Sequence, residues 1–428
     1  MKKILFVFTA GFLSLLSFGQ NIDKTINATE VERIERILAA DDMQGRKTFT
    51  PGNDKAAEFI AAEFAKSKLK FFGKATSYFQ DFTMAKAKAL SVSGSIDSEP
   101  LTTDNVAVNT TMEEVNINSL KDFELVVVKK EDDFSKIVFP IFDEKKNYLV
   151  LVDTAHTKRF KGIQRFTGNA KFPSTISQVF ILTANLHPTS FALHVKNQLS
   201  EQKLRNIVGV LPGRSKKDES VVFSGHYDHL GIGKPNEAMD SIFNGANDDA
   251  AGTTGVIMLA NYFSKLNNNE RTLIFVAFTA EEIGGFGSRY FSEQLDADKV
   301  VAMFNLEMIG TESNWGKNSA YITGYEKSDF GKILQKNLAG SNFRFEPDPY
   351  PKQNLFYRSD NATLAELGVP AHTISTSKMD SEKNYHTQDD EIETLDLNNM
   401  AEIIKAIALS SKTIISGEDT PTRIEKRK

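Results

Sequence analysis

The chain has 428 residues, enough for one large domain or two domains of ordinary size. Its hydrophobic fraction of 40% and charged fraction of 25% are those of an ordinary globular protein. The formal net charge of −5 provides no basic surface of the kind that binds nucleic acid, so we expect no nucleic-acid partner. Cysteine is absent, which excludes disulfides, thiolate zinc sites and a cysteine nucleophile.

Residues 1–19 have the pattern of a secretory signal peptide. Lys2 and Lys3 precede an uncharged apolar run, residues 4–18, that is shorter than a membrane span, and small residues surround a cleavage point before Gln20. A membrane anchor is the alternative interpretation. We expect an exported protein, periplasmic or secreted, without stable membrane association after cleavage, and the absence of cysteine agrees with a bacterial periplasm.

The N-terminal part of the main domain, residues 20–77, is expected to be helical. Apolar residues recur at helical spacing in residues 30–40 and again in residues 55–66. Between about residues 78 and 200 the pattern changes to short β-prone runs separated by polar segments. These runs are residues 89–92, 123–128, 137–141, 148–152 and 178–182. They predict a small β-rich module inserted into the main domain.

In the main part, residues 201–428, apolar strands alternate with amphipathic helices. Strands are expected at residues 204–211, 221–224, 272–279, 300–306, 320–323 and 371–375, and helices at residues 250–263, 288–293, 328–338 and 397–415. Several of these strands have no charged residue, as in strands that are covered on both faces. The alternation predicts an α/β fold, a three-layer α/β/α sandwich around a mixed, largely parallel sheet.

Polar residues with metal-binding side chains stand where the predicted strands end. His226 and Asp228 follow the strand at residues 221–224, in the sequence Gly-His-Tyr-Asp-His. Ligands bind at strand ends in open α/β sheets. Asp228 is placed either to hydrogen-bond the imidazole or to ligate a metal directly. A cluster that only caps the turn is the alternative.

Two adjacent acids, Asp248 and Asp249, precede the helix expected at residues 250–263. For Asp249 we favour a capping role, which suits an acid at a helix N-terminus. For Asp248 we favour a carboxylate shared between two cations, because Gly245 and Asn247 beside it allow a special backbone turn.

Glu281 and Glu282 directly follow an uncharged strand. Two carboxylates at the end of a buried strand are costly unless positive charge or catalysis accompanies them. One glutamate can bind a metal while its neighbour takes a proton from water. The alternative is a pair of acids in an exposed glycine-rich loop.

Two further candidates lie later in the chain. Glu307 ends the strand at residues 300–306, and His386 lies in a polar loop before the last helix. His229 and His372 are interpreted as supporting or structural residues. Together the candidates comprise two imidazoles and at least three acids, a ligand set that suits zinc bound by nitrogen and oxygen.

Taken jointly, these motifs resemble the di-zinc aminopeptidase family, which also includes glutamate carboxypeptidase, glutaminyl cyclase and the transferrin-receptor ectodomain. The resemblance covers residues 201–416, with a looser match at residues 43–46 and 50–55. The β-rich stretch stands where some relatives insert a protease-associated domain.

The resemblance implies a role for each motif residue. His226 and Glu307 would hold one zinc ion, Glu282 and His386 would hold the other, and Asp248 would bridge them, followed by a cis peptide bond to Asp249. Glu281 would be the general base that moves a proton from water to the leaving amine. Asp228 would orient His226, and Tyr385 would help to stabilise the oxyanion.

Two residues depart from the family pattern. Many relatives have aspartate at the position of Glu307, and many have histidine at the position of Asn361 in the sequence Arg-Ser-Asp-Asn. The resulting expectation is an exported zinc-dependent aminopeptidase that cleaves peptides with two zinc ions. The alternatives are a transferase similar to glutaminyl cyclase, with one zinc ion, and a non-catalytic receptor or binding protein on the same fold.

Overall fold

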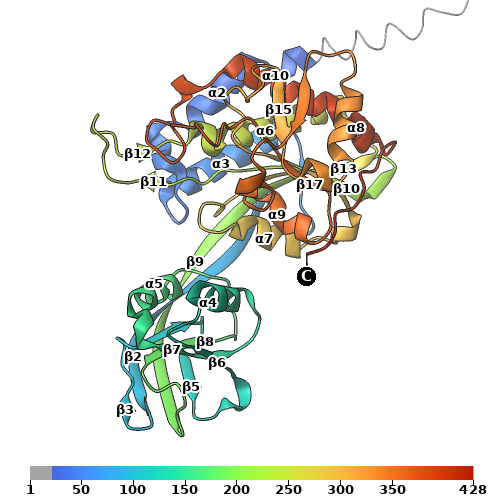
Figure 1. Ribbon diagram of the computed structural model, residues 1–428. Helices are drawn as coiled ribbons and strands as arrows, with labels where there is room; N and C mark the ends of the chain where they lie inside the picture. The colour runs from blue at the N-terminus through green and yellow to red at the C-terminus, as the bar shows by residue number, and fades with distance from the viewer. Residues whose placement is uncertain (1–21, 428) are drawn as a thin grey trace, which may run out of the picture. The chain divides into compact units, whose positions relative to one another are not determined.

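The computed structural model describes residues 22–427, so the expected signal peptide lies outside the described residues. The chain forms two compact units (Figure 1). Among the described residues, the first unit comprises residues 22–81 together with residues 204–427, and the second unit comprises residues 82–203. Within residues 22–427, no helix is both long enough and apolar enough to cross a membrane.

The first unit is built on a central sheet with the strand order β16-β15-β17-β14-β10-β13-β9. Neighbouring strands are parallel except at the pairs β15–β17 and β13–β9. The bounds are β9 (Phe191–Leu211), β10 (Lys216–His226), β13 (Arg271–Phe278), β14 (Val300–Leu306), β15 (Ser319–Ile322), β16 (Arg344–Pro347) and β17 (Ala371–Ser375). The sheet is therefore mixed and largely parallel, as the sequence predicts. Of the seven strands named here, β16 is the one that the apolar pattern missed.

Helices cover both faces of this sheet (Figure 1). Side chains alternate between the two faces along each strand, so each strand packs against helices on both sides. Phe223 faces one hydrophobic cluster and Val222 faces the other. The first cluster is completed by α2 (Ala28–Leu38), α3 (Pro51–Lys66), α6 (Ala251–Leu266), α8 (Phe330–Asn337) and α10 (Leu397–Ser410). The second is completed by α7 (Phe286–Glu293) and α9 (Asn361–Glu366). The predicted three-layer α/β/α sandwich is confirmed.

The second unit contains a sheet with the strand order β4-β8-β7-β6. Its bounds are β4 (Val106–Asn109), β6 (Glu124–Val128), β7 (Tyr148–Asp153) and β8 (Gln178–Thr183), with two helices, α4 (Phe134–Asp143) and α5 (Thr157–Thr167). The strand predicted at residues 137–141 is wrong, because these residues belong to α4. Asp133 caps this helix by accepting from the amides of Ser135 and Lys136, and the buried residues Val138 and Ile141 recur at helical spacing.

Candidate metal centre

The candidate ligands lie at strand ends and in the loops that follow them at one edge of the sheet, because β10, β13 and β14 are parallel. In the register of this sheet, His226 pairs with Phe278 and Ser224 pairs with Asn305. The loops that contain His226, Glu281 and Glu307 therefore leave the sheet at neighbouring positions. This is the edge at which open α/β sheets bind their ligands.

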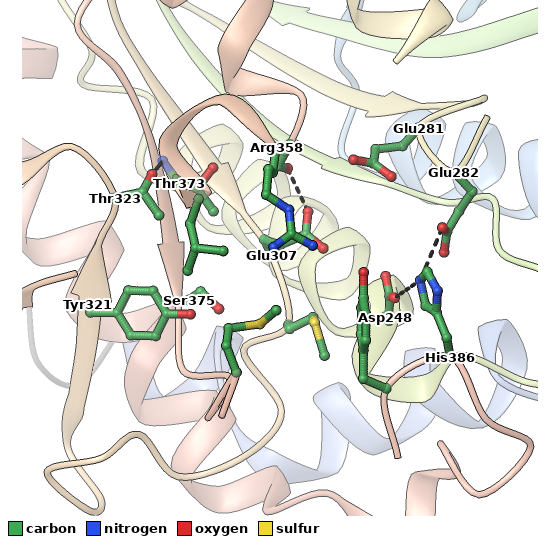
Figure 2. Close-up of a pocket in the computed structure, with 15 residues that line it drawn as sticks. Asp248, Glu281, Glu282, Glu307, Tyr321, Thr323, Arg358, Thr373, Ser375 and His386 are labelled. Carbon is green, nitrogen blue, oxygen red and sulfur yellow. Dashed lines mark hydrogen bonds and ion pairs between the residues drawn. The ribbon is translucent and has the colours of Figure 1, made fainter. Parts of the chain in front are cut away.

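Asp248 presents its two carboxylate oxygens to two different sets of side chains. Its Oδ1 lies 3.2 Å from Nε2 of His226, and this nitrogen lies 3.4 Å from Oε1 of Glu307. Its Oδ2 lies 3.2 Å from Nε2 of His386, which lies 3.2 Å from Oε2 of Glu282. Asp248, Glu282 and His386 can be followed together in Figure 2. A single carboxylate thus joins both predicted ligand sets.

A third imidazole, that of His229, belongs to the second set. Its Nδ1 lies 2.7 Å from Oε1 of Glu282 and 3.9 Å from Oδ2 of Asp248, and its ring is fully buried. Its ring also lies edge-on to that of His386, with 5.7 Å between the centroids. The sequence analysis interprets His229 as a supporting or structural residue, and its contact with Glu282 agrees with a supporting role.

The backbone turn that carries Asp248 is held from several directions. Gly245 has a φ of +56°, and a Cβ atom at this position would collide with the Asp248 backbone and the His229 ring. The two carboxylate oxygens of Asp390 accept hydrogen bonds from the amides of Asn247 and Asp248, at 2.9 and 3.0 Å. As the resemblance implies, the peptide bond between Asp248 and Asp249 is cis.

Asp249 does more than cap the following helix. One of its oxygens accepts from the amide of Gly252, three residues on, as expected for a cap. The same oxygen accepts from the amide of Met308, and the other oxygen accepts from the amide of His226, each at 3.0 Å. Asp249 therefore fixes the backbone of the two loops that carry His226 and Glu307.

The side chain of Asp228 does not orient the imidazole of His226, contrary to the expectation. Nδ1 of His226 is hydrogen-bonded to the backbone carbonyl of Asp228 at 3.0 Å, whereas the nearer carboxylate oxygen lies 3.8 Å away. The carboxylate instead accepts from the backbone amide of Glu281 at 3.1 Å and from the hydroxyl of Thr48 at 2.9 Å. Asp228 thus orients His226 through its carbonyl group and holds the Glu281 loop with its side chain.

The acids and imidazoles of the site change one another's pKa values. Burial alone would lower the pKa of His226, but Glu307 and Asp248 raise it well above its usual value. Hydrogen bonds to Asp248 and Glu282 raise the pKa of His386 to about 10. Burial alone would raise the pKa of Asp248, yet the bonds from His226 and His386 lower it. The carboxylates of the site therefore stabilise positive charge next to them.

A pocket lies next to these side chains. Asp248, Glu281, Glu282 and His386 lie at one end of it, and Tyr321 lies at the other end (Figure 2). Its further lining is mainly apolar or uncharged and includes Met308, Thr323, Leu355, Ser359, Thr373, Ser375, Met379 and Tyr385, with Arg358 as a cation. A pocket with a largely apolar or uncharged wall and a few polar groups at one end is typical of a small-molecule site.

The two departures from the family pattern have clear local consequences. Glu307 reaches His226 with one oxygen, and its other oxygen accepts from the hydroxyl of Ser359 at 2.6 Å. Asn361 is fully buried behind the pocket, where its oxygen accepts from the hydroxyl of Thr373 at 2.8 Å. Asn361 therefore braces a residue of the pocket wall and does not itself line the pocket.

Tyr385 lies beside the candidate ligands. Its ring stacks on that of His386 with 3.9 Å between the centroids, and it lines the pocket. Burial raises the pKa of its hydroxyl, so the group keeps its proton at neutral pH. Tyr385 is therefore available as a hydrogen-bond donor.

The donor set fits zinc. Ligand atoms of His226, Asp248 and Glu307 lie within 4.8 Å of one another, and so do those of His229, Asp248 and Glu282. All of these ligand atoms are imidazole nitrogen or carboxylate oxygen, which zinc binds. Carboxylates gathered this closely in a largely buried site need cations to offset the cost of their charge.

Residues 206–410 match the model of peptidase family M28. A probable leucine aminopeptidase of Trichophyton verrucosum is 29% identical over 220 residues, which cover 49% of this chain and 56% of that protein. The chain spans about half of the length of the curated relatives that it matches first.

Two solved structures share the fold. An aminopeptidase from Aneurinibacillus sp. strain AM-1 has a TM-score of 0.54 at 17% identity, with 95% of this chain and 97% of that chain covered. A zinc aminopeptidase from Bacillus subtilis has a TM-score of 0.54 at 16% identity, with 91% and 95% covered. At these identities the likeness shows the fold.

Proposed function

Since residues 206–410 match the model of peptidase family M28, we propose that the chain is an exported zinc-dependent aminopeptidase that uses two zinc ions. The observation that supports this most directly is the position of Asp248, whose two oxygens face separate ligand sets. His226 and Glu307 would hold one ion, and Glu282 and His386 would hold the other. His229 supports the second set through Glu282.

Bound zinc would polarise the scissile carbonyl group and lower the pKa of water. Glu281 is the proposed general base, because its carboxylate lies in the pocket beside the ligands (Figure 2). Burial raises the pKa of the Glu281 carboxyl group well above its usual range. Asp228 holds the backbone amide of Glu281 and so fixes the direction of this side chain.

Other side chains would bind the substrate and the developing charge. The hydroxyl of Tyr385 is available to donate a hydrogen bond to the oxyanion. The apolar wall formed by Met308, Leu355 and Met379 suits an uncharged side chain at the cleaved residue. The names of several curated relatives refer to leucine aminopeptidases, which agrees with such a preference.

The test is a digest of a peptide library, read by mass spectrometry with and without a chelator. We expect loss of single N-terminal residues, protection of peptides with a blocked N-terminus, and loss of activity with the chelator. Hydrolysis that is unchanged by the chelator would refute the proposal.

Metal analysis of the purified protein separates the alternatives. Two zinc ions per chain support the peptidase. One ion together with cyclisation of N-terminal glutamine would indicate a cyclase, and an intact fold without zinc would indicate a non-catalytic protein. Export is tested separately, by N-terminal sequencing of the protein from the cell envelope or medium, where we expect the mature chain to begin at Gln20.

A further inference from the structure

One buried arginine outside the ligand set contacts the backbone next to His226 and the turn that carries Asp248. Arg46 lies in the short helix η1 (Asp41–Arg46), and its side chain is fully buried. Its Nε donates to the carbonyl of Tyr227 at 2.8 Å. Its two terminal nitrogens donate to the carbonyls of Asn244 and Gly245, at 2.6 and 2.9 Å.

These acceptors lie on separate parts of the site. Tyr227 is the residue between His226 and Asp228, whereas Asn244 and Gly245 begin the turn that carries Asp248. A fourth bond, from a terminal nitrogen to the carbonyl of Leu38, anchors the guanidinium to the end of α2. The planar guanidinium thus spans two ligand loops from a third element, which a single ammonium group cannot do with the same geometry.

The backbone around Arg46 is held in an unusual conformation. Gln44, Gly45 and Arg46 have φ values of +52°, +62° and +47°. Such values are uncommon for residues other than glycine and are kept only where the surroundings enforce them. The carbonyl of Arg46 accepts from the side-chain amide of Asn53 at 3.0 Å and from the backbone amide of His229 at 3.4 Å. Both the side chain and the backbone of Arg46 therefore form hydrogen bonds with the loops of the site.

We propose that Arg46 is a positioning residue that sets the spacing between the His226 loop and the Asp248 turn and thereby the affinity of the site for zinc. Only the statement about zinc rests on the proposed function. The positioning itself concerns the backbone and is open to measurement on the metal-free protein.

A second buried arginine provides a matched control. Arg271 is 2% exposed, and its guanidinium donates four hydrogen bonds, two of them to the carbonyls of Ile414 and Asp419 and two to side-chain oxygens. It lies at the start of β13, whereas Glu281 and Glu282 follow the end of that strand. Arg271→Lys therefore removes a comparable set of hydrogen bonds without touching the ligand loops.

The first measurement is hydrogen exchange of the metal-free variants Arg46→Lys and Arg271→Lys. We expect amides in residues 226–229 and 244–249 to exchange at least tenfold faster in Arg46→Lys than in the unmodified protein. Arg271→Lys should leave them unchanged and instead affect the C-terminal segment. Unchanged exchange at both loops in a folded Arg46→Lys protein would overturn the inference, whether or not the chain is a peptidase.

The second measurement is zinc affinity by competition with a chelator of known strength. Substitution of groups that support metal ligands typically lowers metal affinity by roughly 10- to 100-fold. We expect a loss in this range for Arg46→Lys and none for Arg271→Lys. Equal loss in both variants would mean that Arg46 is only a stabilising residue. If Arg46→Lys does not fold, Asn53→Ala takes its place, because it removes the hydrogen bond to the Arg46 carbonyl and leaves the guanidinium in place. Faster exchange at the two loops and weaker zinc binding would again support the inference, and unchanged exchange would overturn it.

Discussion

Glu35, on the buried face of α2, offers a prediction whose size follows from the structure. Its side chain is fully buried, and neither carboxylate oxygen has a hydrogen-bond partner. Burial raises the pKa of this carboxyl group from 4.5 to about 8. Below pH 4.5 the group is neutral in both the folded and the unfolded chain, so it costs nothing. Between pH 4.5 and 8 the unfolded chain releases the proton while the folded chain keeps it, and the free energy of unfolding falls.

The size of this loss follows from the two pKa values. Each pH unit in this interval costs about 1.4 kcal/mol, so at pH 7 the cost reaches about 3 kcal/mol. The variant Glu35→Gln has no proton to lose. We therefore expect it to be about as stable as the unmodified protein at pH 4.5 and more stable by about 3 kcal/mol at pH 7.

The assay is urea unfolding of the chelator-treated proteins at several pH values from 4.5 to 7.5, followed by circular dichroism. Glu32→Gln is the control, because Glu32 lies on the same helix but its side chain is 43% exposed and pairs with Arg36. We expect this control to track the unmodified protein at every pH. A stability difference between Glu35→Gln and the unmodified protein that does not change with pH would refute the reasoning.

Three further predictions concern the site and its surroundings. Glu281→Gln should retain zinc but lower kcat by roughly 10²- to 10⁴-fold, measured with aminoacyl anilides, and full activity would exclude Glu281 as the base. His229→Ala should lower the affinity for the second zinc ion by roughly 10- to 100-fold in a chelator titration, because Oε1 of Glu282 loses its hydrogen bond to His229. Burial lowers the pKa of His372 from 6.5 to about 4, so its contribution to stability is present above pH 6.5 and is lost as the pH falls toward 4. His372→Gln should flatten this dependence in unfolding experiments by up to about 3 kcal/mol, and an unchanged profile would contradict it.

The sequence by itself predicts the fold, because strands of the central layer are apolar along their whole length and helices of the outer layers are apolar on one face. The strand at Arg271–Phe278, which has no charged residue after Arg271, and the helix at Ala251–Leu266 are recognisable from that pattern alone. The pattern misled in the second unit, where Val138 and Ile141 also suit a strand but a cap at Asp133 starts a helix. Short apolar runs are ambiguous between the two structures.

The side chains that lie around Asp248 were also predicted from the sequence. They follow strands that are parallel, and the carboxyl ends of parallel strands meet at one edge of the sheet. The sequence did not assign the contacts within the site. Asp228 bonds His226 with its carbonyl group, and His229 joins Glu282, because side-chain direction depends on the packing around each loop.

The role of Arg46 was decided by tertiary structure alone. All four of its acceptors are backbone carbonyl oxygens, which every residue possesses and which therefore leave no pattern in the sequence. Residue types can reveal which side chains are suited to bind a metal. Only the folded chain shows which backbone groups hold those side chains at the required distance.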